Sequence, residues 1–161
     1  MFGEENFELN DTKVIKIKYF THFVNGENQK VTSLSKIIKG DWIDLRSAVS
    51  VSLKKGQSAL IPLGVGMQLP QGYEAIVAPR SSTFKKYHII QTNSIGVIDN
   101  SYCGDNDEWL LSIYATEDTI IPFNDRICQF RIQKSQPTIQ FDMVDHFNNN
   151  DRGGFGSTGE K

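Results

Sequence analysis

The chain has 161 residues, of which 39% are hydrophobic, and this suits one globular domain with a substantial core. Lysine and arginine total 17 against 19 aspartate and glutamate, so a net charge of −2 gives no global field that would hold a nucleic-acid backbone. The longest apolar stretches, such as ALIPLGVGMQL at 59–69, are too short and too interrupted by proline and glycine to insert into a membrane.

The chain begins with an acidic segment and continues into a predicted strand. MFGEENFELND at 1–11 has neither the basic nor the apolar region of a secretory signal, so we expect a cytoplasmic protein. Residues 13–20 alternate, with Ile15, Ile17 and Tyr19 on one face, and this period of two predicts a half-buried strand. A turn of helix is expected within 33–40.

The next segment, GDWIDLRSA at 40–48, places two charged residues on one face of a strand. Asp44 and Arg46 are two residues apart, which is the repeat of side chains along one face. The simplest interpretation is an ion pair at the edge of a sheet.

Many short strands dominate the rest of the chain. Strand-like runs follow at 48–53, 58–65, 73–79, 88–93, 109–115, 119–123 and 126–133. Turn-rich pieces such as KKGQ, LPQG and TED separate them. This spacing favours an all-β sandwich, jelly roll or barrel.

The segment VAPRSSTFKK at 77–86 predicts a second short helix, over 81–87, and outlines a phosphate site. Ser81 and Ser82 suit an N-cap, and backbone N–H groups, two hydroxyls and the Arg80 guanidinium could converge on one anion. A capped helix with a surface arginine remains the alternative.

Two later segments carry further candidates. NSIGVIDNSYCGD at 93–105 predicts a hairpin that displays Asp99 and Tyr102 around its bend, although this fragment by itself favours the simpler interpretation that Asp99 and Asn100 supply turn chemistry. In FNDRICQF at 123–130, Arg126 and Gln129 are three residues apart, so on a regular strand they face opposite ways, and a bulge or a site at the start of the strand would be needed to bring them together.

The chain ends in a glycine-rich tail, RGGFGSTG at 152–159, with Phe155 as its one apolar residue. Such a segment cannot form a core by itself. We therefore expect a folded domain over 1–147 and a flexible tail over 148–161. The two cysteines and three histidines lack metal-ligand spacing, which argues against a zinc site.

The order of these segments resembles the five motifs of the trimeric dUTP pyrophosphatase (dUTPase) family. The motifs are Asp44-Leu45, Pro79-Arg80-Ser81-Ser82, NSIGVIDNSYCG at 93–104, Asp125 to Gln129, and the tail from Arg152 to Gly159. The resemblance implies a jelly-roll-like all-β fold with very little helix, a homotrimer with sites shared between subunits, and hydrolysis of dUTP to dUMP and pyrophosphate. That reaction keeps uracil out of DNA and supplies dUMP for dTMP synthesis.

The resemblance also implies the roles of individual residues. Asp99 would hold the attacking water, and Asp44 and Arg126 would support the site. Uracil and deoxyribose would contact Asn93, Gly96, Val97, Ile98, Tyr102 and Phe155. The phosphates would contact Arg80, Ser81, Ser82, Gln129, Arg152, Gly156, Ser157 and Thr158. Mg²⁺ would be held mainly by the phosphates and water, with Asp44 touching it through water.

Two other functions fit the sequence less well. A dCTP deaminase, which shares the fold, needs a glutamate on the strand after the hairpin, whereas WLLSIYA at 109–115 offers Ser112 and Glu108 precedes it. A regulatory module that has lost catalysis is disfavoured because the candidate site residues are present together.

Overall fold

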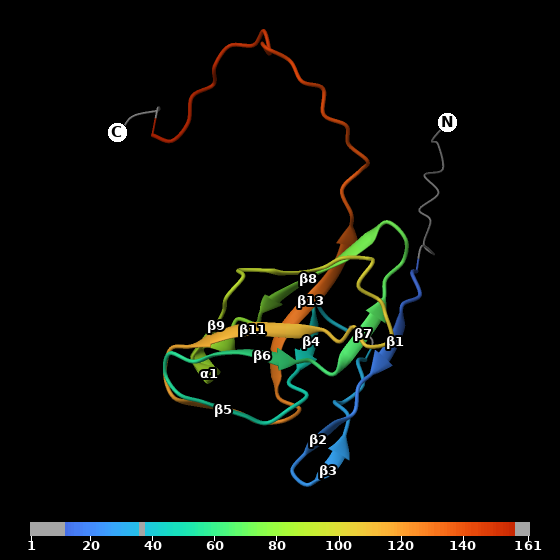
Figure 1. The fold of residues 1–161 in the computed structure, drawn as a ribbon, viewed down its shortest axis with the longest axis vertical. Helices are drawn as coiled ribbons and strands as arrows, with labels where there is room; N and C mark the ends of the chain where they lie inside the picture. The colour runs from blue at the N-terminus through green and yellow to red at the C-terminus, as the bar shows by residue number, and fades with distance from the viewer. Residues whose placement is uncertain (1–11, 36–37, 157–161) are drawn as a thin grey trace, which may run out of the picture.

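The computed structural model describes residues 12–35 and 38–156, and these form strands and one short helix (Figure 1). The strands are β1 (Lys16–Tyr19), β2 (His22–Val24), β3 (Glu27–Gln29), β4 (Ile43–Arg46), β5 (Val51–Leu53), β6 (Ser58–Pro62), β7 (Val65–Gln68), β8 (Tyr73–Pro79), β9 (Ile89–Gln91), β10 (Gly96–Ile98), β11 (Leu110–Ala115), β12 (Thr119–Ile121) and β13 (Arg126–Lys134). The helix α1 spans Thr83–Tyr87. The described part of the chain contains no helix long and apolar enough to cross a membrane.

Antiparallel pairing arranges these strands into two larger and three smaller sheets. One larger sheet has the order β10-β8-β13-β4 and the other the order β6-β11-β9. The smaller ones pair β1 with β7, β12 with β5, and β2 with β3. The longest ladder joins β8 to β13, with Cys128 opposite Pro79 at one end and Lys134 opposite Tyr73 at the other.

The core lies between the inward faces of the two larger sheets. Phe130 on β13 and Leu45 on β4 come from one sheet, and Ile61 on β6 and Ile113 on β11 come from the other, all essentially inaccessible to solvent. Trp109, just before β11, packs edge to face on Phe130 with ring centroids 5.2 Å apart. The all-β jelly-roll-like fold expected from the sequence is confirmed, with a five-residue helix as the described helical content.

Each expected strand run contains an observed strand, and β8 coincides with its run. The hairpin of β2 and β3 was not predicted, although its turn has a strong signal. Asn25 and Gly26 form this two-residue turn with φ of 54° and 86°. Positive φ at both central residues is typical of the Asn-Gly hairpin turn.

The helical turn expected within 33–40 is wrong for the described residues of that segment, because 33–35 and 38–40 are not helical, and residues 36–37 lie outside the description. Tertiary hydrogen bonds instead hold the start of this segment against distant parts of the chain. The N–H of Leu34 donates to the Tyr19 hydroxyl at 2.7 Å, and the N–H of Thr32 donates to Oδ1 of Asn124 at 2.9 Å. A helix this short gains too little to compete with them.

The expected helix after β8 is confirmed, but the serines do not cap it. Ser82 occupies the N-cap position and makes no side-chain capping hydrogen bond. Thr83 stabilises the junction instead. Its buried hydroxyl accepts from the N–H of Arg80 at 2.8 Å and donates to the carbonyl of Ile127 at 2.9 Å, so it connects β8, α1 and β13.

We therefore expect Thr83→Val to destabilise the protein and Ser82→Ala to leave stability nearly unchanged. Valine preserves the shape of threonine but leaves a buried N–H and a buried carbonyl without this partner, which costs about 1–3 kcal/mol. Denaturant unfolding of both variants measures the difference. Equal losses of stability in the two variants would contradict the assigned role of Thr83.

Candidate active site

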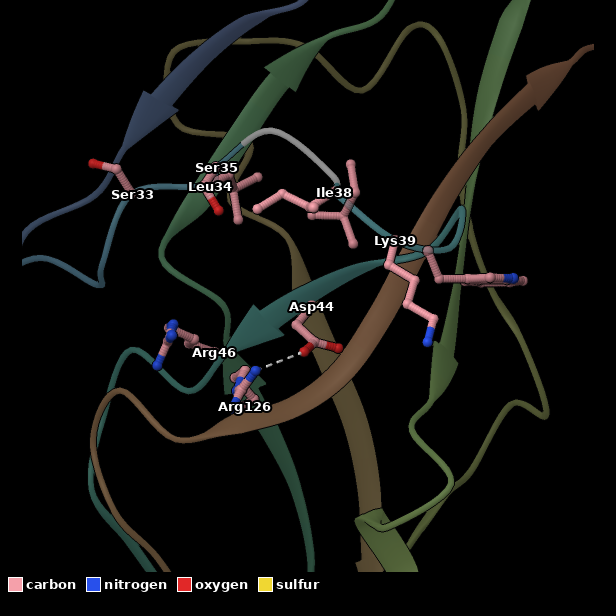
Figure 2. Close-up of a pocket in the computed structure, with 10 residues that line it drawn as sticks. Ser33, Leu34, Ser35, Ile38, Lys39, Asp44, Arg46 and Arg126 are labelled. Atoms are coloured by element: carbon pink, nitrogen blue, oxygen red, sulfur yellow. Dashed lines mark hydrogen bonds and ion pairs between the residues drawn. The ribbon is translucent and has the colours of Figure 1, made fainter.

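Two arginines from different strands share one carboxylate. The Nε of Arg80, just after β8, donates to Oδ1 of Asp44 on β4 at 2.9 Å. Nη1 of Arg126, at the start of β13, donates to Oδ2 of Asp44 at 3.3 Å, as Figure 2 shows. The carboxylate orients both guanidinium groups, and each retains further N–H donors that an anion could accept from. We refer to Asp44, Arg80 and Arg126 as the arginine cluster.

The expected ion pair between Asp44 and Arg46 is replaced by these contacts. Nη1 of Arg46 donates to the carbonyl oxygen of Asn124 at 2.7 Å. Residues two apart on a strand are separated by nearly 7 Å along the backbone, whereas residues of adjacent strands lie closer together. The carboxylate of Asp44 therefore pairs with cations brought by β8 and β13.

A β-bulge in β13 brings Arg126 and Gln129 to one face, as the sequence requires if both are to act together. Arg126 lies opposite Arg46 and Cys128 lies opposite Leu45, so Ile127 is the extra residue between them. Gln129 lies opposite Asp44 and its Nε2 donates to the carbonyl of Pro79 at 3.0 Å. The arginine cluster and Gln129 consequently share one face of the sheet.

A cavity of about 210 Å³ opens beside the arginine cluster (Figure 2). It is lined by Ser33, Leu34, Ser35, Ile38, Lys39, Trp42, Ile43, Asp44, Arg46 and Arg126. The lining includes three cationic side chains, one carboxylate and two serine hydroxyls, and Arg126 is the cation that contacts the carboxylate in Figure 2. This composition suits a phosphate or another small anion.

The segment between β8 and α1 contributes the two predicted serines. Ser81 is exposed and Ser82 is half-buried, directly after Arg80 of the arginine cluster. The N–H of Arg80 is already bonded to Thr83, so it is not one of the free backbone donors expected from the sequence. The two hydroxyls and the guanidinium remain the candidate anion ligands of this segment.

Asp99 lies in a different place, in the turn that follows β10. The hairpin expected over 93–105 is not formed, because among the described strands β10 pairs with β8 and β9 pairs with β11. Its Oδ1 accepts the hydroxyl and the N–H of Ser101, the latter at 2.8 Å. The hydroxyl of Ser101, followed by its N–H, lowers the pKa of the Asp99 carboxyl, which is fully exposed. Asp99 is thus a carboxylate at neutral pH, and no described residue donates to its Oδ2.

Tyr102 and Asp99 line a common cavity of about 400 Å³. Val97, Ile98, Ser101 and Leu110 complete its lining. The Tyr102 hydroxyl donates to the carbonyl oxygen of Glu108 at 2.8 Å. Burial, with smaller contributions from the charges of Asp107 and Glu108, raises the pKa of Tyr102, so the hydroxyl remains a donor at neutral pH. The cavity, which we call the hairpin cavity, therefore combines an apolar wall, a fixed aromatic ring and one carboxylate.

The remaining residues predicted for the hairpin flank this cavity. Gly96 is half-buried on β10 opposite Val77, and Asn93 is exposed in the turn before β10; neither belongs to the lining above. The neighbouring Asn100 anchors the turn after β10, because its Nδ2 donates to the carbonyls of Leu69, Pro70 and Tyr73, at 2.8 Å for Pro70.

The C-terminal tail extends away from both sheets (Figure 1). Arg152 and Gly156 are exposed, and Phe155 is fully exposed with φ of 50°. The predicted residues Ser157 and Thr158 lie outside the described residues. Within the described tail, the candidates are therefore far from both the hairpin cavity and the arginine cluster of the same chain.

The hairpin cavity and the arginine cluster lie toward opposite ends of β8. Ile98 is opposite Ala75, so Asp99 comes next to the start of β8, whereas Arg80 follows its end. Five or six residues of strand span roughly 20 Å. Within one chain, therefore, the hairpin cavity and the arginine cluster lie far apart, although the sequence motifs suggest that they act together.

Several residues that shape the site were not foreseen from the sequence. Ser101 lies two residues after Asp99 in the same turn, which is its only sequence signal. Asn100 was expected as a turn residue, but its contacts with three backbone carbonyls were not. His22 and Glu108 form a pair 86 residues apart, and nothing local in the sequence indicates it.

A family model and a curated relative both match this chain, and they indicate the same family. The dUTPase family model matches residues 42–159. The SPbeta prophage-derived deoxyuridine 5′-triphosphate nucleotidohydrolase of Bacillus subtilis is 54% identical over 147 residues, which cover 91% of this chain and 99% of that protein.

Solved structures agree in fold. A Staphylococcus bacteriophage 80alpha dUTPase with dUPNHPP matches with a TM-score of 0.70 at 19% identity, covering 92% of this chain and 99% of that one. A mutant dUTPase from phage phi11 of S. aureus, described with a structural Mg(II) ion, matches with a TM-score of 0.68 at 18% identity, covering 85% of this chain and 100% of that one.

Proposed function

The chain belongs to the dUTPase family, and we propose that it hydrolyses dUTP to dUMP and pyrophosphate. The observation that carries this proposal is the hairpin cavity, in which the ionised Asp99 and the ring of Tyr102 lie together. A cavity of this size suits a nucleoside, and the carboxylate would lie near the start of its phosphate chain.

Uracil would bind along β10 and the turn before it. β10 is the edge strand of its sheet, so the N–H and C=O groups on its outer side are free of a described strand partner. The main chain of Gly96, Val97 and Ile98, with the Asn93 side chain, would match the hydrogen-bonding edge of uracil. Tyr102 would pack beneath the deoxyribose.

Asp99 would act as the general base. Its Oδ2 would accept a hydrogen bond from water, while Ser101 holds Oδ1 and keeps the group ionised. The water oxygen attacks the α-phosphorus as its proton passes to Asp99, and the bond between the α-phosphorus and the bridging oxygen breaks. The electron pair leaves with pyrophosphate, and dUMP is the other product.

The phosphates would contact the arginine cluster and its neighbours. Arg80, the hydroxyls of Ser81 and Ser82, and Gln129 would bind the phosphate oxygens directly, while Arg126 and Asp44 hold Arg80 in place. The tail would close over the nucleotide, with Phe155 stacked on uracil and Arg152, Gly156, Ser157 and Thr158 at the phosphates.

The donor set fits a Mg²⁺ ion that arrives with the substrate. The described residues contain no group of three candidate metal ligands, and both oxygens of Asp44 already accept from arginines. Mg²⁺ is commonly held by substrate phosphates and water, and Asp44 would contact it through water. When bound, the cation would neutralise charge on the phosphates. The structural Mg(II) ion described for the phage phi11 relative is compatible with this proposal.

The distance between the two groups supports the proposal of a homotrimer with shared sites. Within one chain, Asp99 and Arg80 are roughly 20 Å apart along β8, further than neighbouring phosphates of one nucleotide require. The tail also extends away from its own sheets (Figure 1). The hairpin cavity of one subunit would therefore be completed by the arginine cluster and the tail of others.

Deamination of dCTP is disfavoured by two contacts. The carboxylate of Glu108 is bound by His22, with Nε2 to Oε1 at 2.6 Å, so it is not a free carboxylate that could activate water. On β11, the hydroxyl of Ser112 hydrogen-bonds that of Thr92 at 2.6 Å.

Incubation of the protein with Mg²⁺ and, separately, dUTP, dCTP, dTTP and UTP tests the reaction by chromatography of the products. We expect dUMP and pyrophosphate from dUTP and little turnover of the other three. Asp99→Asn is the matched control, because it keeps the side-chain shape and should retain nucleotide binding while turnover falls by orders of magnitude. Full turnover in this variant would contradict Asp99 as the base.

Ser101→Ala should move the acid limb of the pH profile to higher pH. The hydroxyl of Ser101 lowers the pKa of Asp99, and a base is active only when ionised, so its removal lets that pKa rise toward its ordinary value. Profiles of kcat/KM for dUTP from about pH 4 to 8 measure the shift. Ser58→Ala, an exposed serine on β6, should leave the profile unchanged. A shift to lower pH in Ser101→Ala would be inconsistent with this assignment.

Mixed trimers test the shared site. Chains with Asp99→Asn and chains with Arg80→Gln, each inactive alone, should regain activity when expressed together, in roughly a quarter of the sites for random assembly. Differently tagged chains allow the mixed species to be purified before assay. If every mixed trimer stays inactive although each homotrimer is folded, the two residues belong to one subunit's site.

A further inference from the structure

The acidic segment Gly104 to Trp109 has no role in the mechanism above, yet it holds the ring that would face the sugar. The Tyr102 hydroxyl donates to the backbone carbonyl of Glu108 at 2.8 Å. The position of the ring in the hairpin cavity therefore depends on where the backbone at Glu108 lies.

The side chain of Glu108 is held by a residue from the other end of the chain. Nε2 of His22, at the start of β2, lies 2.6 Å from Oε1 and 3.0 Å from Oε2 of Glu108. The pair is largely shielded, with side-chain exposures of 25% for His22 and 12% for Glu108. A carboxylate this buried is costly to leave without its partner.

Other contacts fix the same segment against β1 and β7. Nζ of Lys18 donates to the carbonyl of Asp105 at 2.6 Å, and the N–H of Gly104 donates to Oδ2 of Asp107 at 2.7 Å. The backbone of Asp107 approaches Gly66 on β7 so closely that a Cβ at position 66 would lie 2.9 Å from the Asp107 carbonyl oxygen. The segment is thus packed against β1 and β7 on one side, and the His22–Glu108 pair holds its end next to Trp109.

We propose that His22 and Glu108 are positioning residues that hold Tyr102 in place and thereby set the preference for deoxyribose over ribose. This inference rests on the proposed function, because it concerns the sugar of the same substrate. Neither residue touches the reacting atoms; they act through the Glu108 carbonyl and the Tyr102 hydroxyl.

The physical reason is that discrimination against a single hydroxyl requires a wall that does not move. A ring held by a hydrogen bond at its far end cannot retreat without losing that bond. If Glu108 loses His22, its carboxylate gains by turning toward water, its carbonyl shifts, and Tyr102 can move away from the sugar. Space for the 2′-hydroxyl then opens, so kcat/KM for UTP should rise relative to that for dUTP.

The test compares kcat and KM for dUTP and UTP in the wild type, His22→Ala, Glu108→Gln and Tyr102→Phe. We expect the dUTP:UTP ratio of kcat/KM to fall about five- to tenfold in His22→Ala and Tyr102→Phe. In His22→Ala most of the change should lie in the kinetic constants for UTP, with kcat for dUTP close to that of the wild type. The double variant His22→Ala with Tyr102→Phe should have a dUTP:UTP ratio no lower than that of either single variant, because both changes act through the hydrogen bond between the Tyr102 hydroxyl and the Glu108 carbonyl. Glu108→Gln keeps a hydrogen-bond acceptor for His22 and should retain most of the discrimination.

Asp118→Asn is the matched control, since it breaks an exposed ion pair, 3.0 Å from Lys54, far from the hairpin cavity. It should leave the ratio unchanged. Hydrogen exchange of residues 102–108 gives a readout independent of activity, and His22→Ala should speed it there selectively. If His22→Ala fails to fold, two measurements replace it: the dUTP:UTP ratio of Tyr102→Phe, and hydrogen exchange of residues 102–108 in Glu108→Ala.

A folded His22→Ala protein with an unchanged dUTP:UTP ratio and unchanged exchange at 102–108 would overturn this inference. Failure of the wild type to hydrolyse dUTP is a different result: it overturns the proposed function and the sugar preference with it. Faster exchange in His22→Ala would in that case still support the pair as the anchor of Tyr102.

Discussion

The ladder between β8 and β13 is the interaction on which the rest of the structure depends. Its seven residue pairs, from Cys128 opposite Pro79 to Lys134 opposite Tyr73, join strands that lie about fifty residues apart in the chain. One face of this ladder supplies Phe130 to the core. Its two ends carry the two halves of the candidate site, the hairpin cavity near the start of β8 and the arginine cluster near its end. The length of the ladder therefore fixes their separation, and that separation is the basis for proposing a site shared between subunits.

The two halves are built by opposite physical means. The arginine cluster depends on the bulge at Ile127, which turns Arg126 toward Asp44 and so places two cations on one carboxylate. The turn after β10 instead depends on its own polar contacts, chiefly those of the Ser101 hydroxyl and N–H with Asp99, which lower the pKa of that exposed carboxyl. Strand pairing thus brings the charged side chains together at one end of β8, and local hydrogen bonds orient the single carboxylate at the other end.

Several parts of this arrangement were predictable because their causes are local. Alternation and turn residues predicted most strands, the turn that displays Asp99 and Tyr102, and a bulge as one way to bring Arg126 and Gln129 together. Predictions failed where a distant partner decides the outcome. The segment near Leu34 is held by the distant Tyr19 hydroxyl, and the junction before α1 is held by the Thr83 hydroxyl on the carbonyl of Ile127 in β13, with no side-chain cap from Ser82.

By itself the sequence determined the strand-rich fold, the family and the candidate side chains, since periodicity, turn chemistry and the order of the motifs are all properties of neighbouring residues. Tertiary structure alone decided which charges meet. Asp44 pairs with Arg80 and Arg126 and not with Arg46, and His22 pairs with Glu108 across 86 positions of sequence. Such contacts depend on strand register and sheet order, and register is set by the packing of the whole core.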